Sequence, residues 1–435
     1  MQYRSIGSPE KLLGAREALL RGIAPDGTLY VPQSMPALSA EMIQRLPSLE
    51  FHVICVEIAR LFFPIQEIPL AGLEKIICES INFDAPVLTL DDRVSVLELF
   101  HGPTLAFKDF GARFMARVLS YFVREDSTEL TVLVATSGDT GSAVAQGFFK
   151  VPGVRVVILY PKGKISKMQE AQLATLGGNI QALEIAGNFD DCQRLVKSAF
   201  LDTEISKCRR LTSANSINIA RLIPQIFYYF RAVAQLKTSR APLIISVPSG
   251  NFGNLIAGLM AKALGLPLWK FVAATNLNDV FVSYLRSGEF RPRASLPTLS
   301  NSMDVGDPSN LARIRHMYGD NAEKLREDVS AFSFSDAQTR AAIADVFDRY
   351  CYILDPHGAV AYLGLKTMLE LHPHARGIFF ETAHPAKFPD ALSKEAARAL
   401  QVPQRLSEAL GKKICSTPLS SKFEDLKGYL LHSKL

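Results

Sequence analysis

The sequence predicts an α/β protein with two open, mostly parallel twisted sheets, helices on both faces of each sheet, and an N-terminal segment. From about residue 95, apolar runs rich in β-branched residues alternate with segments of helical periodicity. This alternation is typical of parallel strands that are covered on both faces. Glycine-containing turns stand where two of the strands lead into helices. The chain has 435 residues, 48% of them hydrophobic, which is enough for a large core and two or three domains.

The N-terminal part is more mixed than the rest of the chain. Helical spacing is present at 39–48 and 51–63, and a Pro-Asp-Gly turn within 24–32 leads into a short strand. We predict three parts, namely an N-terminal segment at 1–92, a small α/β domain at 93–225, and a large α/β domain with C-terminal helices at 226–435.

The regular part of the chain divides into two series of elements. The first series has predicted strands at 95–100, 130–136, 154–161 and 179–187, and predicted helices at 111–123, 142–150, 166–177 and 189–202. A short strand at 211–213 then leads to a long helix at 219–236. The second series has predicted strands at 242–250, 270–277 and 377–382, and predicted helices at 254–265, 336–353 and 358–372.

Composition excludes several classes of function. The net charge of +5 is small, and Lys and Arg are spread along the chain, which argues against a nucleic-acid surface and fits an anionic small molecule. No run of 18 apolar residues predicts a membrane span. The six cysteines form no CxxC pair, and His101, His357 and His384 form no HxxxH or HxH pair. We expect a cytoplasmic protein, although the chain ends in Ser433, Lys434 and Leu435, the peroxisomal tripeptide.

One lysine has unusual neighbours. In "HGPTLAFKDFGARF" (101–114), Lys108 follows the apolar patch Leu105, Ala106 and Phe107 and opens a helix. A surface lysine has no need of such a flank. An apolar surround disfavours the ammonium form and lowers the pKa of a lysine, so the pattern is typical of a lysine that reacts as a free amine.

Two turns share the spacing Gly-x-x-Gly. "SGDTG" (137–141) and "SGNFGN" (249–254) each follow a β-rich strand and open a helix. Glycine allows close backbone approach to a ligand, and N–H groups at a helix start favour an anion. An ordinary strand–helix turn is the alternative for either loop alone. No P-loop and no G-x-G-x-x-G turn is present, which leaves a phosphate-bearing cofactor of another kind.

Pyridoxal phosphate fits these features. It needs a lysine for the Schiff base, an anion cradle for its phosphate, and a partner for its pyridine nitrogen. Lys108 and "SGNFGN" can supply the first two. Thr382, at the carboxyl end of an apolar strand, can supply the third, because strand ends in open α/β sheets face the ligand crevice. A hydroxyl bonded to nearby backbone is an equal alternative for Thr382.

The segment "SANSINIAR" (213–221) is polar and precedes an apolar helix. Asn215, Ser216 and Arg221 together have the donors of a second anion site. A helix cap followed by a solvated arginine is the alternative, and spacing alone favours it.

Several longer motifs together resemble those of the threonine synthase family. They are "ELFHGPTLAFKDFGARFM", "ATSGDTGSAVA", "VVILYPKGKIS", "LGGNI", "SANSINIARL", "SVPSGNFGN", "AATNLND" and "ETAHPAKF". This family belongs to the pyridoxal-phosphate enzymes of fold type II, the tryptophan synthase β superfamily. The motifs cover nearly the whole chain and resemble the longer, enterobacterial- and fungal-like branch of the family.

The resemblance implies roles for residues at matching positions. Lys108 is the expected Schiff-base lysine, and Thr382 is the expected partner of the pyridine nitrogen. The expected cradle of the cofactor phosphate consists of Gly250, Asn251, Phe252, Gly253 and Asn254. The loop expected at the substrate carboxylate contains Ser137, Asp139 and Thr140. The segment expected to receive the substrate phosphate contains Asn215, Ser216 and Arg221.

The implied reaction converts O-phospho-L-homoserine and water to L-threonine and phosphate. Asp139 departs from the shorter branch, where asparagine is frequent. A carboxylate would repel the substrate carboxylate, so Asp139 is expected to orient the loop or to face the cofactor hydroxyl. Two alternatives stay open. One is another fold type II lyase, such as a serine/threonine dehydratase or a cysteine synthase. The other is a silent relative that binds phosphorylated ligands. The expected assembly is a monomer or homodimer.

Overall fold

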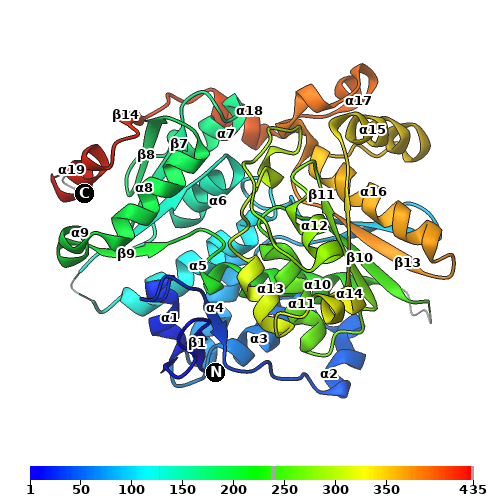
Figure 1. Cartoon of the computed structure of the whole chain (residues 1–435), viewed down its shortest axis with the longest axis horizontal. Coiled ribbons are helices and arrows are strands. Elements are labelled where there is room, and N and C mark those ends of the chain that lie inside the picture. Colours follow the sequence, from blue (N-terminus) through cyan, green and yellow to red (C-terminus); the bar gives the residue numbers. More distant parts are fainter. Residues whose placement is uncertain (127, 237–240, 433–435) are drawn as a thin grey trace.

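The computed structural model describes residues 1–126, 128–236 and 241–432. A six-stranded sheet has the order β12 (Val329–Ser333), β11 (Lys270–Thr275), β10 (Leu243–Pro248), β13 (Arg376–Glu381), β5 (Val94–Glu98) and β4 (Val87–Thr89). Its strands are parallel except for β4, which pairs antiparallel with β5. This large sheet forms one side of the molecule in Figure 1, next to α16 (Pro356–Leu371).

A second, five-stranded sheet is parallel throughout. Its order is β14 (Ser416–Ser420), β8 (Ile180–Ala186), β7 (Val154–Pro161), β6 (Leu130–Ala135) and β9 (Arg210–Ser213). The central strands β6 and β7 are buried along nearly their whole length, as expected for continuous apolar runs between two helical layers. The predicted class, α/β with two mostly parallel sheets, is therefore confirmed.

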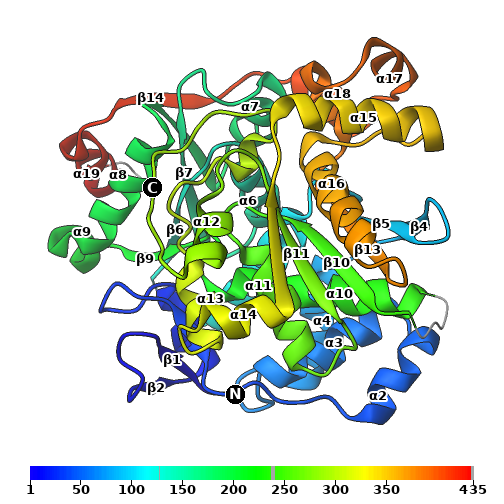
Figure 2. The same ribbon diagram turned by 45° about the vertical axis from the view of Figure 1, so that its right-hand side comes forward.

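Helices cover both sheets and fill the space between them. On the small sheet lie α6 (Asp139–Phe148), α7 (Lys167–Ala174), α8 (Phe189–Leu201), α9 (Thr203–Cys208) and α19 (Phe423–His432). On the large sheet, α16 packs against β10, β11 and β13, and α15 (Asp336–Tyr350) packs on α16. Helix α5 (Lys108–Val123) packs against α6, and α10 (Ile223–Gln235) packs against α5 and α11 (Gly253–Ala263). Figure 2 shows α10 and α11 below strands β10 and β11.

The N-terminal segment packs onto the same core. A small antiparallel sheet of β2 (Leu12–Leu13), β1 (Tyr3–Ser5) and β3 (Tyr30–Pro32) is followed by α3 (Phe51–Phe62) and α4 (Leu70–Ser80). Helix α3 contacts α10, and α4 contacts α5. One cluster of buried side chains extends from Tyr3 and Phe62 through Phe114 to Tyr228. The N-terminal segment thus supports the two helices that lead to the site.

The division into 1–92, 93–225 and 226–435 stays a prediction, but two strands cross its boundaries. Strand β5 falls within 93–225 and pairs with β13 of the large sheet. Strand β14 falls within 226–435 and pairs with β8 of the small sheet. The chain therefore passes between the sheets at both ends, and the residues just after β5 lie where the sheets meet. No helix of the described residues is long and apolar enough to cross a membrane.

Candidate active site

Lys108 stands at the first position of α5, held by contacts with the end of β13. The backbone N–H of Phe107 donates to the carbonyl of Thr382 at 2.9 Å, and Ala106 forms a β-bridge with Ala383. The side chain of Lys108 is 14% exposed. Burial lowers the pKa of Lys108 to about 8, as the apolar flank predicts. Lys108 is therefore far more often a free amine near neutral pH than a surface lysine is.

A cavity of about 370 Å³ opens at Lys108 between the loops that follow the strands of both sheets. Every residue predicted for the site lines it. They are Lys108, Ser137, Asp139, Thr140, Asn215, Ser216, Arg221, Gly250, Asn251, Phe252, Gly253, Asn254 and Thr382. The carboxyl ends of parallel strands, and the helix starts that follow them, thus converge from two sheets onto one lysine.

The loop 249–254 fits a bound phosphate group. Phe252 has a φ of 58°, which turns the chain sharply into α11, and Gly253 is the first residue of that helix. A Cβ atom at Gly250 would lie 2.7 Å from the Cα of Met303, so only glycine fits there without a shift of backbone. The Asn254 Nδ2 donor is buried and has no hydrogen-bond partner among the described residues. This orphaned donor and the helix start agree with an anionic cofactor group.

The segment 213–221 combines donors that face the same cavity. The Ser216 hydroxyl accepts from the amides of Asn251 at 2.8 Å and Asn310 at 3.1 Å. Arg221 ends a 3₁₀ turn, η2 (Ile219–Arg221), which the side chain of Asn218 caps. Arg221 is only 3% exposed. The alternative from spacing is therefore right about the cap and wrong about a solvated arginine, because this side chain is buried against Gly111 of α5.

Arg221 carries a buried charge with donors left over. One guanidinium nitrogen donates to the carbonyl of Ala214, and Nε has no hydrogen-bond partner in the described part of the chain. Among the described residues Arg221 forms no ion pair. Burial lowers its pKa to about 10, and Asp109 offsets only part of this effect. Gly111 makes room for the guanidinium, since a Cβ there would lie 2.7 Å from Nε. An anion in the cavity would compensate this charge.

The loop 137–141 is built by one hydroxyl and one glycine. The Thr136 hydroxyl accepts from the N–H groups of Gly138 at 3.0 Å and Gly141 at 2.8 Å. Gly138 has a φ of 143°, which favours glycine, and a Cβ there would lie 2.4 Å from the amide of Gln169. The loop thereby places Asp139 at the start of α6.

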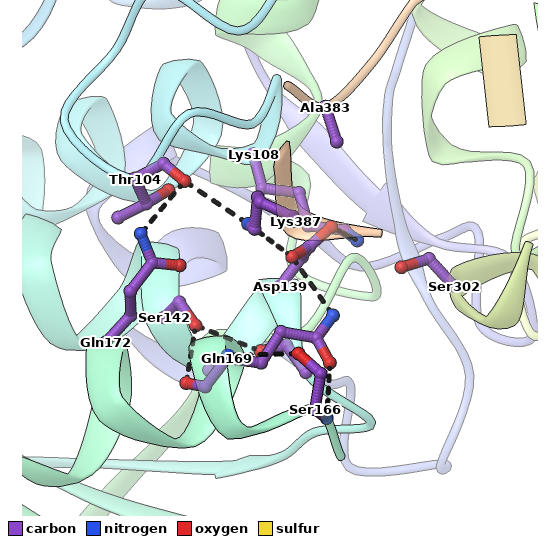
Figure 3. Close-up of polar contacts among 12 residues, drawn as sticks. Thr104, Lys108, Asp139, Ser142, Ser166, Gln169, Gln172, Ser302, Ala383 and Lys387 are labelled. Atoms are coloured by element: carbon purple, nitrogen blue, oxygen red, sulfur yellow. Dashed lines mark hydrogen bonds and ion pairs between the residues drawn. The ribbon is translucent and has the colours of Figure 1, made fainter. Parts of the chain in front are cut away.

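Lys387 is bonded to a residue of the cavity wall, and the sequence analysis did not identify it. Its ammonium is fully buried in η4 (Pro385–Lys387) and donates to Asp139 Oδ1 and to the Thr104 carbonyl, the latter at 3.2 Å (Figure 3). Burial by itself would raise the pKa of Asp139, but the ammonium groups of Lys387 and Lys108 hold it below its ordinary value. The only signal in the sequence is a lone lysine in the apolar stretch "HPAKF" after Thr382.

Thr382 follows β13 and is 5% exposed. Its hydroxyl forms no hydrogen bond with any residue that the structure describes, so the alternative of a backbone-satisfied hydroxyl gains no support. The preceding residue, Glu381, is buried, and burial together with Asp355 raises its pKa well above the ordinary value. Asp355 accepts from the ring Nδ1 of His357, whose Nε2 accepts from the Ser302 N–H at 3.2 Å. This chain of groups supports the loop that covers Gly250.

The described residues contain no group of His, Cys, Asp and Glu able to hold a metal ion. The convergence of a buried lysine, a phosphate cradle and a free strand-end hydroxyl defines a pyridoxal-phosphate-dependent enzyme. In agreement, the family model described as "Pyridoxal-phosphate dependent enzyme" matches residues 86–419, and the model described as "Threonine synthase N terminus" matches residues 2–81.

Comparison with individual proteins identifies the family within this class of enzymes. The threonine synthase of Escherichia coli (strain K12) is 43% identical over 417 residues, 96% of each chain, and that of Haemophilus influenzae is 43% identical over the full length of both. The crystal structure of the Escherichia coli enzyme superposes with a TM-score of 0.92 at 41% identity, and the pyridoxal-phosphate-bound threonine synthase of Brucella melitensis with 0.91 at 35%, each covering 100% of both chains. The chain belongs to the threonine synthase family.

The predictions of fold type, family and cofactor are therefore confirmed. A threonine deaminase from Solanum lycopersicum is 16% identical with a TM-score of 0.55, over 89% of this chain and 98% of that one, which shows the shared fold alone. The roles of individual site residues stay predictions that the geometry accommodates.

Proposed function

We propose that this chain converts O-phospho-L-homoserine and water to L-threonine and phosphate. The observation that supports this proposal best is Arg221. It is a buried cation without an acidic partner among the described residues, and it lines the same cavity as Lys108. A dianionic phosphate ester meets both requirements, since it compensates the charge and accepts the unused donors.

Bound at Lys108, pyridoxal phosphate would supply an electron sink that acidifies the protons of the substrate carbons. The loop Gly250–Asn254 and the Thr382 hydroxyl would hold its phosphate and its pyridine nitrogen. Ser137 and Thr140, in the loop at the start of α6, would bind the substrate carboxylate.

Proton transfer falls to Lys108. Its nitrogen, with a pKa near 8, exists in both protonation states close to neutrality and can both remove and return a proton at the substrate carbons. As the bond between the γ carbon and the phosphate oxygen breaks, Arg221 with the Asn215 and Ser216 donors would stabilise the leaving phosphate. A water molecule then supplies the hydroxyl at the β carbon. The products are one threonine and one phosphate per substrate.

The direct experiment is a phosphate-release assay with O-phospho-L-homoserine, coupled to chromatographic detection of threonine. We expect the two products in a one-to-one ratio. Serine and threonine, tested at the same concentration, should give no comparable release of ammonia. Release of 2-oxo acid from serine at a similar rate would favour the dehydratase alternative. Binding of phosphohomoserine without any turnover would favour the silent relative.

Two further properties concern the assembly of the protein and its cellular compartment. We propose a cytoplasmic protein that acts as a monomer or homodimer, since its cysteines are unpaired and its cavity is lined within one chain. The tripeptide Ser433–Leu435 lies outside the described residues. Size-exclusion chromatography with light scattering tests the assembly, and fractionation of the source cell tests the compartment.

A further inference from the structure

Two lysines share one buried carboxylate beside the cavity. Asp139 Oδ1 accepts from the Lys387 ammonium, and Oδ2 lies 3.9 Å from the Lys108 Nζ (Figure 3). Each carboxylate oxygen therefore faces its own lysine. The amide of Gln169 adds a further hydrogen bond to Oδ1 at 3.2 Å, which fixes the rotation of the carboxylate. The side chain of Asp139 is 3% exposed and that of Lys387 is 0% exposed.

Packing alone does not explain why a charged side chain occupies position 387. A buried ion pair gains little over apolar side chains of the same volume, because the cost of removing two charges from water offsets their attraction. Its second acceptor, the Thr104 carbonyl, belongs to the loop that ends at Lys108, and this carbonyl also accepts from Gln172 at 3.3 Å. Lys387 thus joins three parts of the site wall, which are η4, the loop before α5, and the start of α6.

The charged side chains that act on the Lys108 nitrogen come from four other elements. They are Asp139 on α6, Lys387 on η4, Arg221 on η2 and Asp355 at the start of α16. Two of them are cations and two are anions. His357 contributes to the lowered pKa of Asp139. Burial raises the pKa of Asp109 on α5, and Lys387 offsets part of this effect. Of the two cations, only Lys387 is bonded to a carboxylate that faces Lys108.

We propose that Lys387 is a positioning residue for Lys108, which holds the Asp139 carboxylate in place and balances part of its charge, so that the Lys387–Asp139 pair sets the protonation state of the Lys108 nitrogen. The inference rests on the proposed role of Lys108 in the reaction. It also accounts for an acid in the predicted carboxylate loop, since Lys387 compensates the charge that would repel a substrate carboxylate.

The signs of the effects follow from the charges. Lys387→Met removes a cation and leaves the Asp139 charge to Lys108 alone, so the Lys108 nitrogen holds its proton to higher pH. Asp139→Asn removes the anion and leaves Lys387 uncompensated, so the Lys108 nitrogen loses its proton at lower pH. Opposite charges at this separation shift a pKa by ~1–3 units. The double variant removes both charges and should return the midpoint towards that of the unchanged protein.

The test is a pH titration of the cofactor-loaded protein, followed by the absorbance of the lysine-bound cofactor. Where a midpoint falls outside the accessible range, acylation of Lys108 in the cofactor-depleted protein, quantified by mass spectrometry against pH, gives the same ordering. We expect an upward shift of ~1 unit or more for Lys387→Met and a downward shift for Asp139→Asn. Lys387→Gln keeps a hydrogen-bond donor without the charge, and it replaces Lys387→Met if that variant folds poorly. It should shift the midpoint in the same direction.

Lys262 offers a matched control. Its ammonium also bonds one carboxylate, Asp328 at 2.6 Å, and one carbonyl, Trp269 at 2.8 Å. Asp328 does not line the cavity, whereas Asp139, the partner of Lys387, does. Lys262→Met should leave the midpoint unchanged. A midpoint in Lys387→Met equal to that of Lys262→Met would overturn the proposal, and so would shifts of the same sign in Lys387→Met and Asp139→Asn. No substrate is present, so the result is independent of the phosphohomoserine assay.

Discussion

Among the described residues, two buried arginines lie near the same polar segment, and they differ in their hydrogen bonds. Arg313, on α13 (Leu311–Met317), is 1% exposed, and Arg221 is 3% exposed. Burial lowers the pKa of Arg313 to about 9 and that of Arg221 to about 10. Neither forms an ion pair among the described residues. Burial and charge therefore do not distinguish them.

Their hydrogen bonds do. Each guanidinium nitrogen of Arg313 donates to an oxygen of the protein, at Tyr30, Ser216, Ile217 or Asn310. Arg221 donates to the Ala214 carbonyl, keeps an unpartnered Nε, and lines the cavity. A buried cation whose donors are all satisfied ties segments together. A buried cation with donors directed at a cavity is suited to a ligand.

Lys108→Ala should cause the largest loss of activity, and the two arginine variants are compared with it. Without the amine, no group holds the cofactor covalently or moves the substrate protons, so threonine formation should fall to the background of the assay. Borohydride reduction of the unchanged protein should fix the cofactor on the Lys108 peptide, as seen by mass spectrometry. A label on another lysine, such as Lys387, would contradict the assignment.

Arg221→Ala should give the next largest effect. Loss of one partner of a desolvated charge pair costs ~2–5 kcal/mol, which corresponds to a roughly 30-fold to several thousand-fold fall in kcat/KM for O-phospho-L-homoserine. The free energy of unfolding should fall less than in Arg313→Met, because only one carbonyl, that of Ala214, loses its donor. The spectral change on binding of serine should persist, since serine has no phosphate. Equal losses for serine and phosphohomoserine would make Arg221 structural, like Arg313.

Arg313→Met should reverse this pattern. Methionine keeps much of the volume but leaves the carbonyls of Tyr30, Ser216 and Ile217 without their donor. We expect the free energy of unfolding to fall by ~1–3 kcal/mol, measured by urea denaturation. The value of kcat/KM should fall less than about tenfold, through looser placement of Ser216. A loss of activity as large as that of Arg221→Ala, in a protein of unchanged stability, would break the distinction.

The family resemblance pointed to Arg221, whereas local spacing favoured a solvated arginine, and nothing in the local sequence marks Arg313 as buried, for a physical reason. Chemistry carried by a short segment, such as Lys108 with its apolar flank or the turn 249–254, is visible locally. The same holds for the central strands β6, β7, β10 and β13, whose apolar runs are continuous.

Contacts between distant segments leave no such mark. Arg313 meets Tyr30 across 283 positions, and Lys387 meets Asp139 across 248. Strand β14 has no buried residue and joins the edge of a sheet whose strands lie more than 200 positions earlier. The predicted series of helices and strands therefore omitted β14, and it omitted the short edge strands β4 and β12 for the same reason.

The smallest expected effect is a change in the pKa of Lys108, which should distinguish the two arginines. Arg221 is among the cations that lower the pKa of Lys108 to about 8, after burial and Lys387, and Arg313 is not. A lysine with a lowered pKa becomes a free amine at lower pH, so acylation of Lys108 in the cofactor-depleted protein should reach half its maximal rate near pH 8. In Arg221→Ala this midpoint should rise by a fraction of a pH unit, because a repelling charge is gone. In Arg313→Met it should stay where it is, and equal midpoints in the two variants would show that Arg221, too, acts only through the fold.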